Sequence, residues 1–355
     1  MIRVLQNNSL WGRENLFTTV IGIVLLTFVM GVNAQESGQG KTGVDKAREA
    51  LTKKESDASE EKNLEEIFEA TERTYSLLKK GKYSMTYSFD HSYFQDAGFD
   101  VEIDETVVRR FDIQTDAQHT FSSNLSFDYG YRDNITFNLR IPFVLKYDTQ
   151  NDINTSSLGD LSASVRWQPF PVKRGVPVTT LFSSLSMPTG NSPYEIDVDE
   201  DLSTGSGYYS LSFGLNASQV KDPVVLFGSL SYALNAKATG LNQFRGGAIL
   251  EEVIPGESLA LSMGMAYSLS YDVSVSTSLQ YSYTTDTEFV FQSRTAPPSE
   301  DQFSSVLNFS VGVRTSPSRI VNINLGFGLT EFSSDVILGF SVPIDIASVF
   351  EEAGE

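Results

Sequence analysis

The sequence predicts an all-β membrane protein, a twelve-stranded antiparallel outer-membrane β-barrel with a short N-terminal α-helical periplasmic or plug region. Three observations predict this class. Apolar and polar residues alternate with a period of two over 83–342, as in strands with one lipid-facing side. Short and long connections alternate between these segments, as in barrels with tight turns at one end and loops at the other. The N-terminus also has the features of an export signal.

Composition excludes several functions. The chain has 355 residues, no cysteine, two histidines and a formal net charge of −19. Without cysteine it has no disulfides, thiolate metal sites or cysteine nucleophiles. The negative charge argues against a nucleic-acid partner, because phosphates must be neutralised by Lys and Arg. A mean hydropathy of −0.15 suits a soluble protein, but a barrel gives the same average because only alternate residues meet lipid.

Residues 1–34 are predicted to be a signal peptide. Arg3 and Arg13 lie in a polar leader, 16–29 is mostly apolar, and Ala34 ends a run of small residues that suits signal peptidase. An uncleaved anchor is the alternative, but the apolar run is short for a membrane span. The N-terminal region of the mature chain is then expected in the periplasm, and the barrel in the outer membrane.

A helical region precedes the strands. Residues 35–62 are predicted to be a polar periplasmic segment with weak coiled-coil spacing. Residues 63–81 are predicted to be a helix, because one face is apolar, another is acidic, and Gly81 follows as a stop. We expect this helix either to plug the barrel or to lie in the periplasm. Its proposed plug and gating residues are Leu64, Glu65, Ile67, Phe68, Glu69, Glu72, Tyr75 and Leu78.

The barrel is assigned to residues 82–347, followed by a tail at 348–355. A soluble sandwich also alternates, but its outer face usually carries many Lys and Glu, whereas the polar face here is small and neutral. The expected strands lie near 83–93, 121–129, 135–143, 161–167, 174–187, 209–215, 223–235, 261–269, 273–281, 307–313, 321–329 and 336–342. The expected long loops lie near 95–114, 148–157, 188–204, 236–255 and 285–301, and a short hairpin near 331–335 is an exception.

If the alternate strand positions that hold the aromatic residues face lipid, the positions between them line the lumen. The charged residues predicted on this lining are Asp128, Arg140, Lys146, Arg166 and Arg314. Folding back the 148–157 connection is expected to bring Arg140 and Arg166 to nearly the same height. These arginines could bind the acidic face of the helix, or they could bind acids of the barrel itself. The rest of the lining is predicted to be Ser, Asn and Gly, without an apolar strip.

The sequence predicts no enzyme, no cofactor and no metal site. His91 and His119 fall at the external rim, with lipid-facing parity, on neighbouring strands. Asp90 and Ser92 flank His91, but adjacent strand residues point to opposite faces, so a catalytic group is not favoured. The acidic loop 195–201 lacks the spacing of a calcium-binding loop, and we expect it to be solvated.

Two stretches resemble a known family. They are 65–82 followed by 83–90, and 159–166 together with 185–190 and 202–209. The sequence resembles the FapF-like outer-membrane channels of functional-amyloid (Fap) secretion, and the broader barrel family associated with the phenol-degradation meta-pathway. The resemblance implies a twelve-stranded barrel, a trimerising periplasmic coiled coil, and a helical plug here at 64–80. The coiled-coil heptads in 43–61 depart from that pattern.

The resemblance also implies a function and partners. It implies an outer-membrane secretion channel that exports unfolded amyloid subunits for biofilm fibres. The expected partners are outer-membrane lipid and lipopolysaccharide, the secreted amyloid subunits and a possible homotrimer. The alternative is a passive channel for small or aromatic solutes, and a third class is an adhesive surface protein without transport.

Overall fold

The computed structural model describes residues 77–344, apart from 105–106, 174, 198–199, 222, 246–247, 293–297 and 317–318. The chain divides into two compact units, and all described residues belong to the second, Ser56–Glu355. The signal peptide, the coiled-coil segment, the helix up to residue 76 and the C-terminal tail lie outside the described residues. Among the described residues, no helix has the length and hydropathy to cross a membrane.

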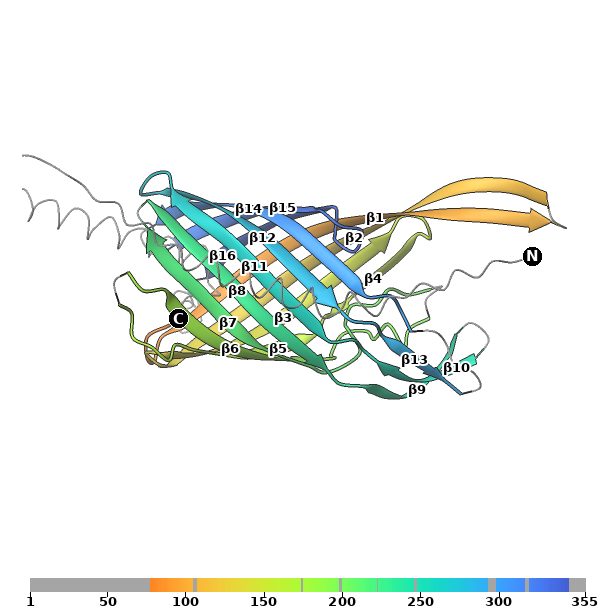
Figure 1. Cartoon of the computed structure of the whole chain (residues 1–355), viewed down its shortest axis with the longest axis horizontal. Helices are drawn as coiled ribbons and strands as arrows, with labels where there is room; N and C mark the ends of the chain where they lie inside the picture. The colour runs from red at the N-terminus through yellow and green to blue at the C-terminus, as the bar shows by residue number, and fades with distance from the viewer. Residues whose placement is uncertain are drawn as a thin grey trace, which may run out of the picture. The chain divides into compact units, whose positions relative to one another are not determined.

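Within the described residues, twelve strands form a closed antiparallel ring (Figure 1). Each pairs with its neighbours in chain order, and the first pairs with the last, so no edge is left along the wall. The barrel predicted from the sequence is confirmed. Its strands are β1 (Tyr83–Asp104), β2 (Val107–Arg132), β3 (Ile135–Asp148), β5 (Leu161–Trp167), β6 (Val178–Met187), β7 (Ser210–Lys221), β8 (Val224–Asn235), β11 (Ser258–Ser268), β12 (Val273–Thr284), β14 (Gln302–Ser316), β15 (Arg319–Gly328) and β16 (Val336–Ile344).

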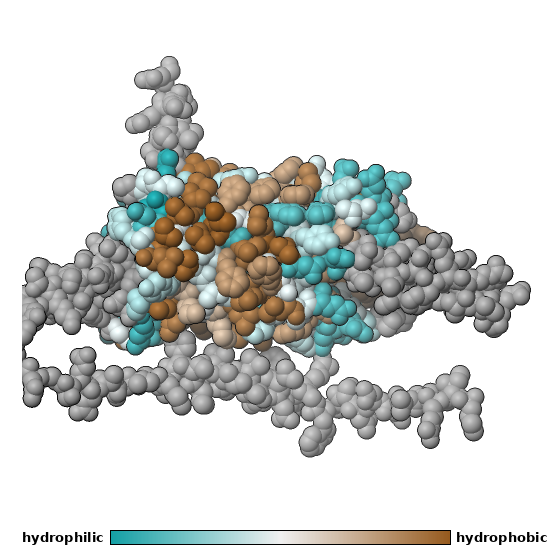
Figure 2. Space-filling view, turned by 90° about the horizontal axis from the view of Figure 1, so that it is seen from above, coloured by the Kyte–Doolittle hydropathy of each residue, from teal (hydrophilic) through white to brown (hydrophobic). Residues whose placement is uncertain are grey.

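Exposed apolar side chains define the outer face of the wall. On β3, Phe137 and Phe143 are 47% and 48% exposed, whereas Thr136 and Val144 beside them are buried. The same alternation recurs on β7, β8, β11 and β14. Figure 2 shows apolar residues gathered on the visible wall and hydrophilic residues toward its two ends. This is the pattern of strands with lipid on one side and a polar interior on the other.

The two ends of the ring differ. We call the end with the short connections, such as 133–134 and 269–272, the turn end, and the opposite end the loop end. At the loop end, β1 and β2 stay paired from Phe94–Gln118 to Asp104–Val107, and Figure 1 shows them extending past the wall as a ribbon. The prediction that residues 95–114 form a loop is therefore wrong, because the main-chain pairing of β1 and β2 continues beyond the wall.

The other long connections also contain strands. They hold β4 (Ile153–Leu158), β9 (Ala238–Arg245), β10 (Ala248–Ile254) and β13 (Glu288–Phe291). β4 pairs with β3 directly beyond the part that pairs with β5. β9, β10 and β13 form a separate three-stranded sheet at the loop end (Figure 1). Its small core is Ala238, Leu241, Leu250 and Val253, against which Tyr194 and Tyr208 pack.

Candidate functional site on the inner wall

Charged residues are concentrated on one side of the barrel interior. The inner face is the parity opposite to the exposed apolar side chains. We call its β1, β2, β3 and β5 part the charged wall, and its β6 to β16 part the neutral wall. Among the described inner-face residues of the strands, Arg314 is the charged member of the neutral wall. The charged wall carries Asp90, Asp128, Arg140, Lys146, Asp148 and Arg166.

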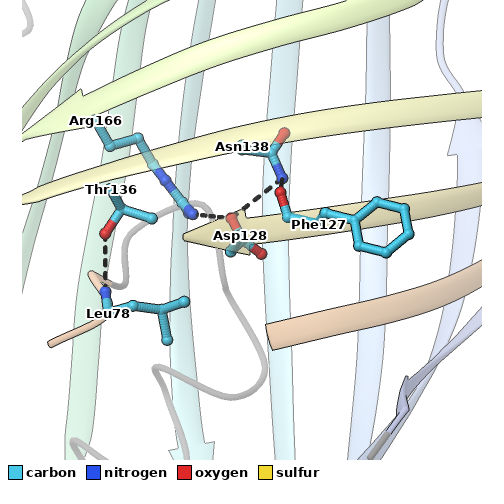
Figure 3. Close-up of polar contacts among 6 residues, drawn as sticks. All are labelled: Leu78, Phe127, Asp128, Thr136, Asn138 and Arg166. Atoms are coloured by element: carbon cyan, nitrogen blue, oxygen red, sulfur yellow. Dashed lines mark hydrogen bonds and ion pairs between the residues drawn. The ribbon is translucent and has the colours of Figure 1, made fainter. Parts of the chain in front are cut away.

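The centre of the charged wall is an ion pair between Arg166 and Asp128 (Figure 3). Both residues are buried, at 8% and 9% exposure. Asn138 lies between them in strand order and donates its Nδ2–H to Asp128 Oδ1 over 3.1 Å. β3 lies between β2 and β5, and it pairs Asn138 with Asp128 on one side and Thr136 with Arg166 on the other. The long Arg166 side chain reaches past β3 to the carboxylate of Asp128. A buried carboxylate is thus matched by a cation and an amide donor.

A second polar group lies nearer the loop end. Arg140 donates from Nε and Nη2 to Asn124 Oδ1, over 3.1 and 2.8 Å. Asn124 is buried and donates its Nδ2–H toward Ser88 Oγ and Asp90 Oδ2, each over 3.4 Å. The amide therefore links a cation on β3 to a carboxylate on β1.

Arg140 and Arg166 do not lie at the same height, contrary to the prediction. Arg140 pairs with Ser162, and Arg166 lies four residues closer to the turn end, opposite Thr136. The turn after β3 is tighter than expected, because Asp148 Oδ1 accepts the backbone N–H groups of Gln150 and Asn151 over 2.8 and 3.2 Å. This Asx-type arrangement ends the turn early, so residues from 153 onward already form β4.

The remaining predicted lining residues are placed as follows. Lys146 is half-buried on β3 and pairs in register with Thr155 of β4. Arg314 lies at the turn end of β14, with its guanidinium carbon 4.8 Å from the ring centre of Tyr271. Of the two alternatives for the arginines, the ion pair with Asp128 supports binding to the barrel's own acids for Arg166. That these residues line a transport path stays a prediction.

Residues 77–82, which we call the entrance segment, bind the charged wall at the turn end. Leu78 N–H donates to Thr136 Oγ1 over 2.9 Å (Figure 3). Lys80 N–H donates to Asp133 Oδ1 over 3.0 Å. Gly81 N–H donates to the carbonyl of Gly130 over 2.7 Å. A Cβ on Gly130 would overlap the backbone carbonyl of Lys79, so glycine is needed for this close approach.

The entrance segment is not helical. Residues 77–79 are irregular and 80–81 form a turn. The prediction that the helix continues to residue 81 is therefore wrong for residues 77–81. Its peptide N–H groups bind the wall instead of a preceding helical turn. Gly81 has a φ of 74°, which suits the expected stop. Leu78 is the one proposed plug residue that is described; Leu64, Glu65, Ile67, Phe68, Glu69, Glu72 and Tyr75 lie outside the described residues.

The neutral wall contains an apolar cluster that the sequence reasoning missed. Short hydroxyl pairs are typical of this wall, such as Ser229 and Ser262, whose Oγ atoms are 2.8 Å apart. Near the turn end, however, Val225, Phe227 and Ala266 are buried together on the inner face. Their inward parity was visible in the sequence, since they alternate with exposed outer residues such as Leu226.

Asp160 organises the loop end beside β4. Its carboxylate accepts the N–H of Gly190 over 3.1 Å and both the N–H and the hydroxyl of Ser206 over 2.6 Å. Burial and the charge of Asp160 raise the pKa of Tyr208, so this phenol stays protonated. These contacts give a structural reason for the motifs at 159–166, 185–190 and 202–209, which the sequence offered only as a family resemblance.

The two histidines lie together on the outer face. His91 Nε2 is 3.1 Å from His119 Nδ1, while Asp90 on the opposite face contacts Asn124. No group of three His, Asp or Glu residues that could hold a metal lies within the described part of the chain. The absence of enzymatic activity stays a prediction.

A closed ring of antiparallel strands with an apolar outer face and a polar inner face defines the class of outer-membrane β-barrels. No family model matches the chain.

Solved structures extend this comparison. An outer-membrane channel from Pseudomonas putida F1 is 13% identical, with 76% of this chain and 97% of that chain covered and a TM-score of 0.59. The translocator domain of the autotransporter NalP from Neisseria meningitidis is 11% identical over 83% and 96%, with a TM-score of 0.41. The toluene transporter TodX of Pseudomonas putida is 7% identical over 78% and 91%, with a TM-score of 0.39. The first of these likenesses establishes a shared fold.

Proposed function

We propose that this protein is a passive channel of the bacterial outer membrane for small solutes. The observation that carries the proposal is the inner wall, which is polar throughout most of its height and has most of its fixed charges on one side. Small hydroxyl and amide side chains offer a passing solute weak, replaceable hydrogen bonds, while the anchored charges set a field across the path. The shared fold with a protein described as an outer-membrane channel supports the same proposal.

Export of unfolded amyloid subunits stays a prediction from the family resemblance. No contact among the described residues favours a sliding polypeptide over a small solute. The two functions differ in a measurable way. An exporter predicts that deletion of its gene abolishes extracellular fibres while their subunits are still made, whereas a diffusion channel predicts slower solute entry and unchanged fibres.

The inner charges indicate which ions the channel favours. The described inner face carries the cations Arg140, Lys146, Arg166 and Arg314 against the anions Asp90, Asp128 and Asp148. Four cations against three anions leave an excess of one positive charge on the described inner face, although the whole chain has a net charge of −19. In a low-dielectric wall such an excess attracts anions. We expect the path to prefer anionic over cationic solutes.

The entrance segment narrows the turn end in this proposal. Its backbone is bonded to Thr136, Asp133 and Gly130, so the chain that precedes β1 is held against the inner face.

The test is single-channel recording of the mature full chain in planar lipid bilayers. We expect discrete conductance steps and, under a KCl gradient, a reversal potential on the anion-selective side. The channel proposal would be refuted if protein that is shown to be folded, by heat-modifiable migration on gels, produced no conductance steps. A reversal potential on the cation-selective side would be consistent with a channel, but it would refute the proposal that the charged wall makes the path prefer anions.

A further inference from the structure

The only two histidines of the chain come together at the loop end of the outer face. They stand on diagonal positions of two paired strands, because His91 lies opposite Phe121 and Tyr93 lies opposite His119. Their rings are nearly parallel, at 11°, with centres 5.3 Å apart. Both side chains are half-buried, so the pair is partly accessible.

Neighbouring aromatic rings hold this arrangement. Phe121 stacks on His91 at 4.6 Å and 18°, and the ring of Tyr93 lies 5.0 Å from His119. Side chains restrained in this way lose little further freedom when they bind a ligand, which lowers the cost of forming a site.

The distance between the facing nitrogens suits a metal chelate. Imidazole nitrogens bind Zn²⁺ at about 2.0–2.1 Å, which separates two such ligands by about 3.3 Å in a tetrahedral site and about 2.9 Å at a right angle. The observed separation of His91 Nε2 and His119 Nδ1 is 3.1 Å, within this interval. Neutral imidazole can carry its proton on either nitrogen, so a tautomer shift and a small ring rotation free both facing nitrogens.

We propose that His91 and His119 form a two-histidine site for a divalent transition-metal ion on the outer face of the barrel. The pair supplies two ligands, and water fills the remaining positions when the protein is in detergent. This site is separate from the inner wall and does not depend on the proposed channel function. Cu²⁺ is the probe of choice, because it binds nitrogen ligands most tightly among the first-row divalent ions.

The experiment titrates Cu²⁺ into the mature full chain, folded in detergent and purified without a polyhistidine tag. We expect one bound Cu²⁺ per chain, with an electron paramagnetic resonance spectrum that shows coupling to imidazole nitrogen. His91→Gln and His119→Gln should each weaken binding by about tenfold or more. Tyr93→Phe is the matched control, since it keeps the ring, removes no proposed ligand and should bind Cu²⁺ as the unmodified chain does.

Three results would overturn the proposal. They are a spectrum without imidazole coupling, equal affinity in the unmodified chain and both histidine variants, or loss of binding in the Tyr93→Phe control. Retained heat-modifiability on gels confirms that each variant is folded before binding is compared.

A graft tests whether the geometry suffices. Tyr281 and Phe303 occupy the same diagonal relation on β12 and β14, since Tyr283 lies opposite Phe303, and their rings stack at 5.9 Å and 21°. Tyr281→His with Phe303→His, placed in the His91→Gln chain, should restore Cu²⁺ binding. A folded graft that binds no Cu²⁺ would contradict the claim that this diagonal register makes the site.

Discussion

The charged wall and the neutral wall share the same alternation of apolar outer and polar inner residues. They differ in how many strands their side-chain hydrogen bonds and ion pairs span. On the charged wall, Arg166 reaches past β3 to Asp128, and Asn124 links Arg140 to Asp90. On the neutral wall, hydroxyls meet on adjacent strands, as in the Ser258–Thr284 contact of 2.9 Å. Long side chains tie several strands together and create a field, whereas short ones leave room. One periodic pattern therefore produces a charged side that is tied across several strands and a neutral side whose hydroxyls meet between neighbouring strands.

The largest expected effect comes from breaking the ion pair of the charged wall. Arg166→Ala leaves Asp128 buried without its cation, and should lower the free energy of unfolding by about 3–5 kcal/mol. Denaturant titration of the protein in lipid vesicles measures it. The double variant Arg166→Met with Asp128→Leu should lose much less, because no charge is stranded. Equal losses in the single and double variants would show that the pair contributes packing rather than charge compensation.

The neutral wall should reject a charge that the other side accommodates. Asn216 on β7 is 1% exposed, and Asn216→Asp places a carboxylate between β6 and β8, whose described inner-face residues include no cation. We expect a loss of about 3 kcal/mol in the same titration. The exposed Asn154→Asp is the control, with an expected change within about 0.5 kcal/mol. If both substitutions change the free energy of unfolding equally, the proposed difference between the charged and the neutral wall is wrong.

Ion selectivity sharpens the comparison without a large change in stability. Arg140→Gln together with Lys146→Gln removes two cations from the charged wall, and should move the reversal potential toward cation selectivity. Ser278→Lys adds a cation to the neutral wall and should move it the other way. Bilayer recordings in a salt gradient measure both shifts. If neither variant moves the potential, the fixed charges of the inner face do not set selectivity.

The smallest effect concerns the entrance segment. Thr136→Val removes the acceptor of the Leu78 N–H and should cost about 1 kcal/mol. The released segment should become more sensitive to trypsin after Lys79 and Lys80. Thr180→Val is the matched control, because Thr180 is equally buried on β6 and is not bonded to this segment in the described structure. Equal cleavage in the two variants would show that Thr136 does not hold the segment.

Much of the fold could be predicted because a barrel wall imposes one rule on every strand. A residue such as Phe137 must meet lipid, so its parity assigns the inner face of Thr136, Asn138 and Arg140. The contacts were harder to predict, since they depend on register. The Asx-type turn at Asp148 shifts β4 and β5 along β3, and this separates Arg140 from Arg166. The bend of the entrance segment depends on tertiary bonds to Thr136 and Gly130, which outweigh local helix propensity.

The seam between β1 and β16 constrains the order of assembly. Its pairs run from Met85–Ile344 to Tyr93–Val336, and so join residues from opposite ends of the barrel sequence. β1 therefore keeps one unpaired edge until β16 has been delivered. Contacts of such sequence separation form slowly and leave exposed edges in the meantime. The first strand of a nascent barrel therefore needs shielding until the last strand arrives, and the wall closes only when the β1–β16 pairs form.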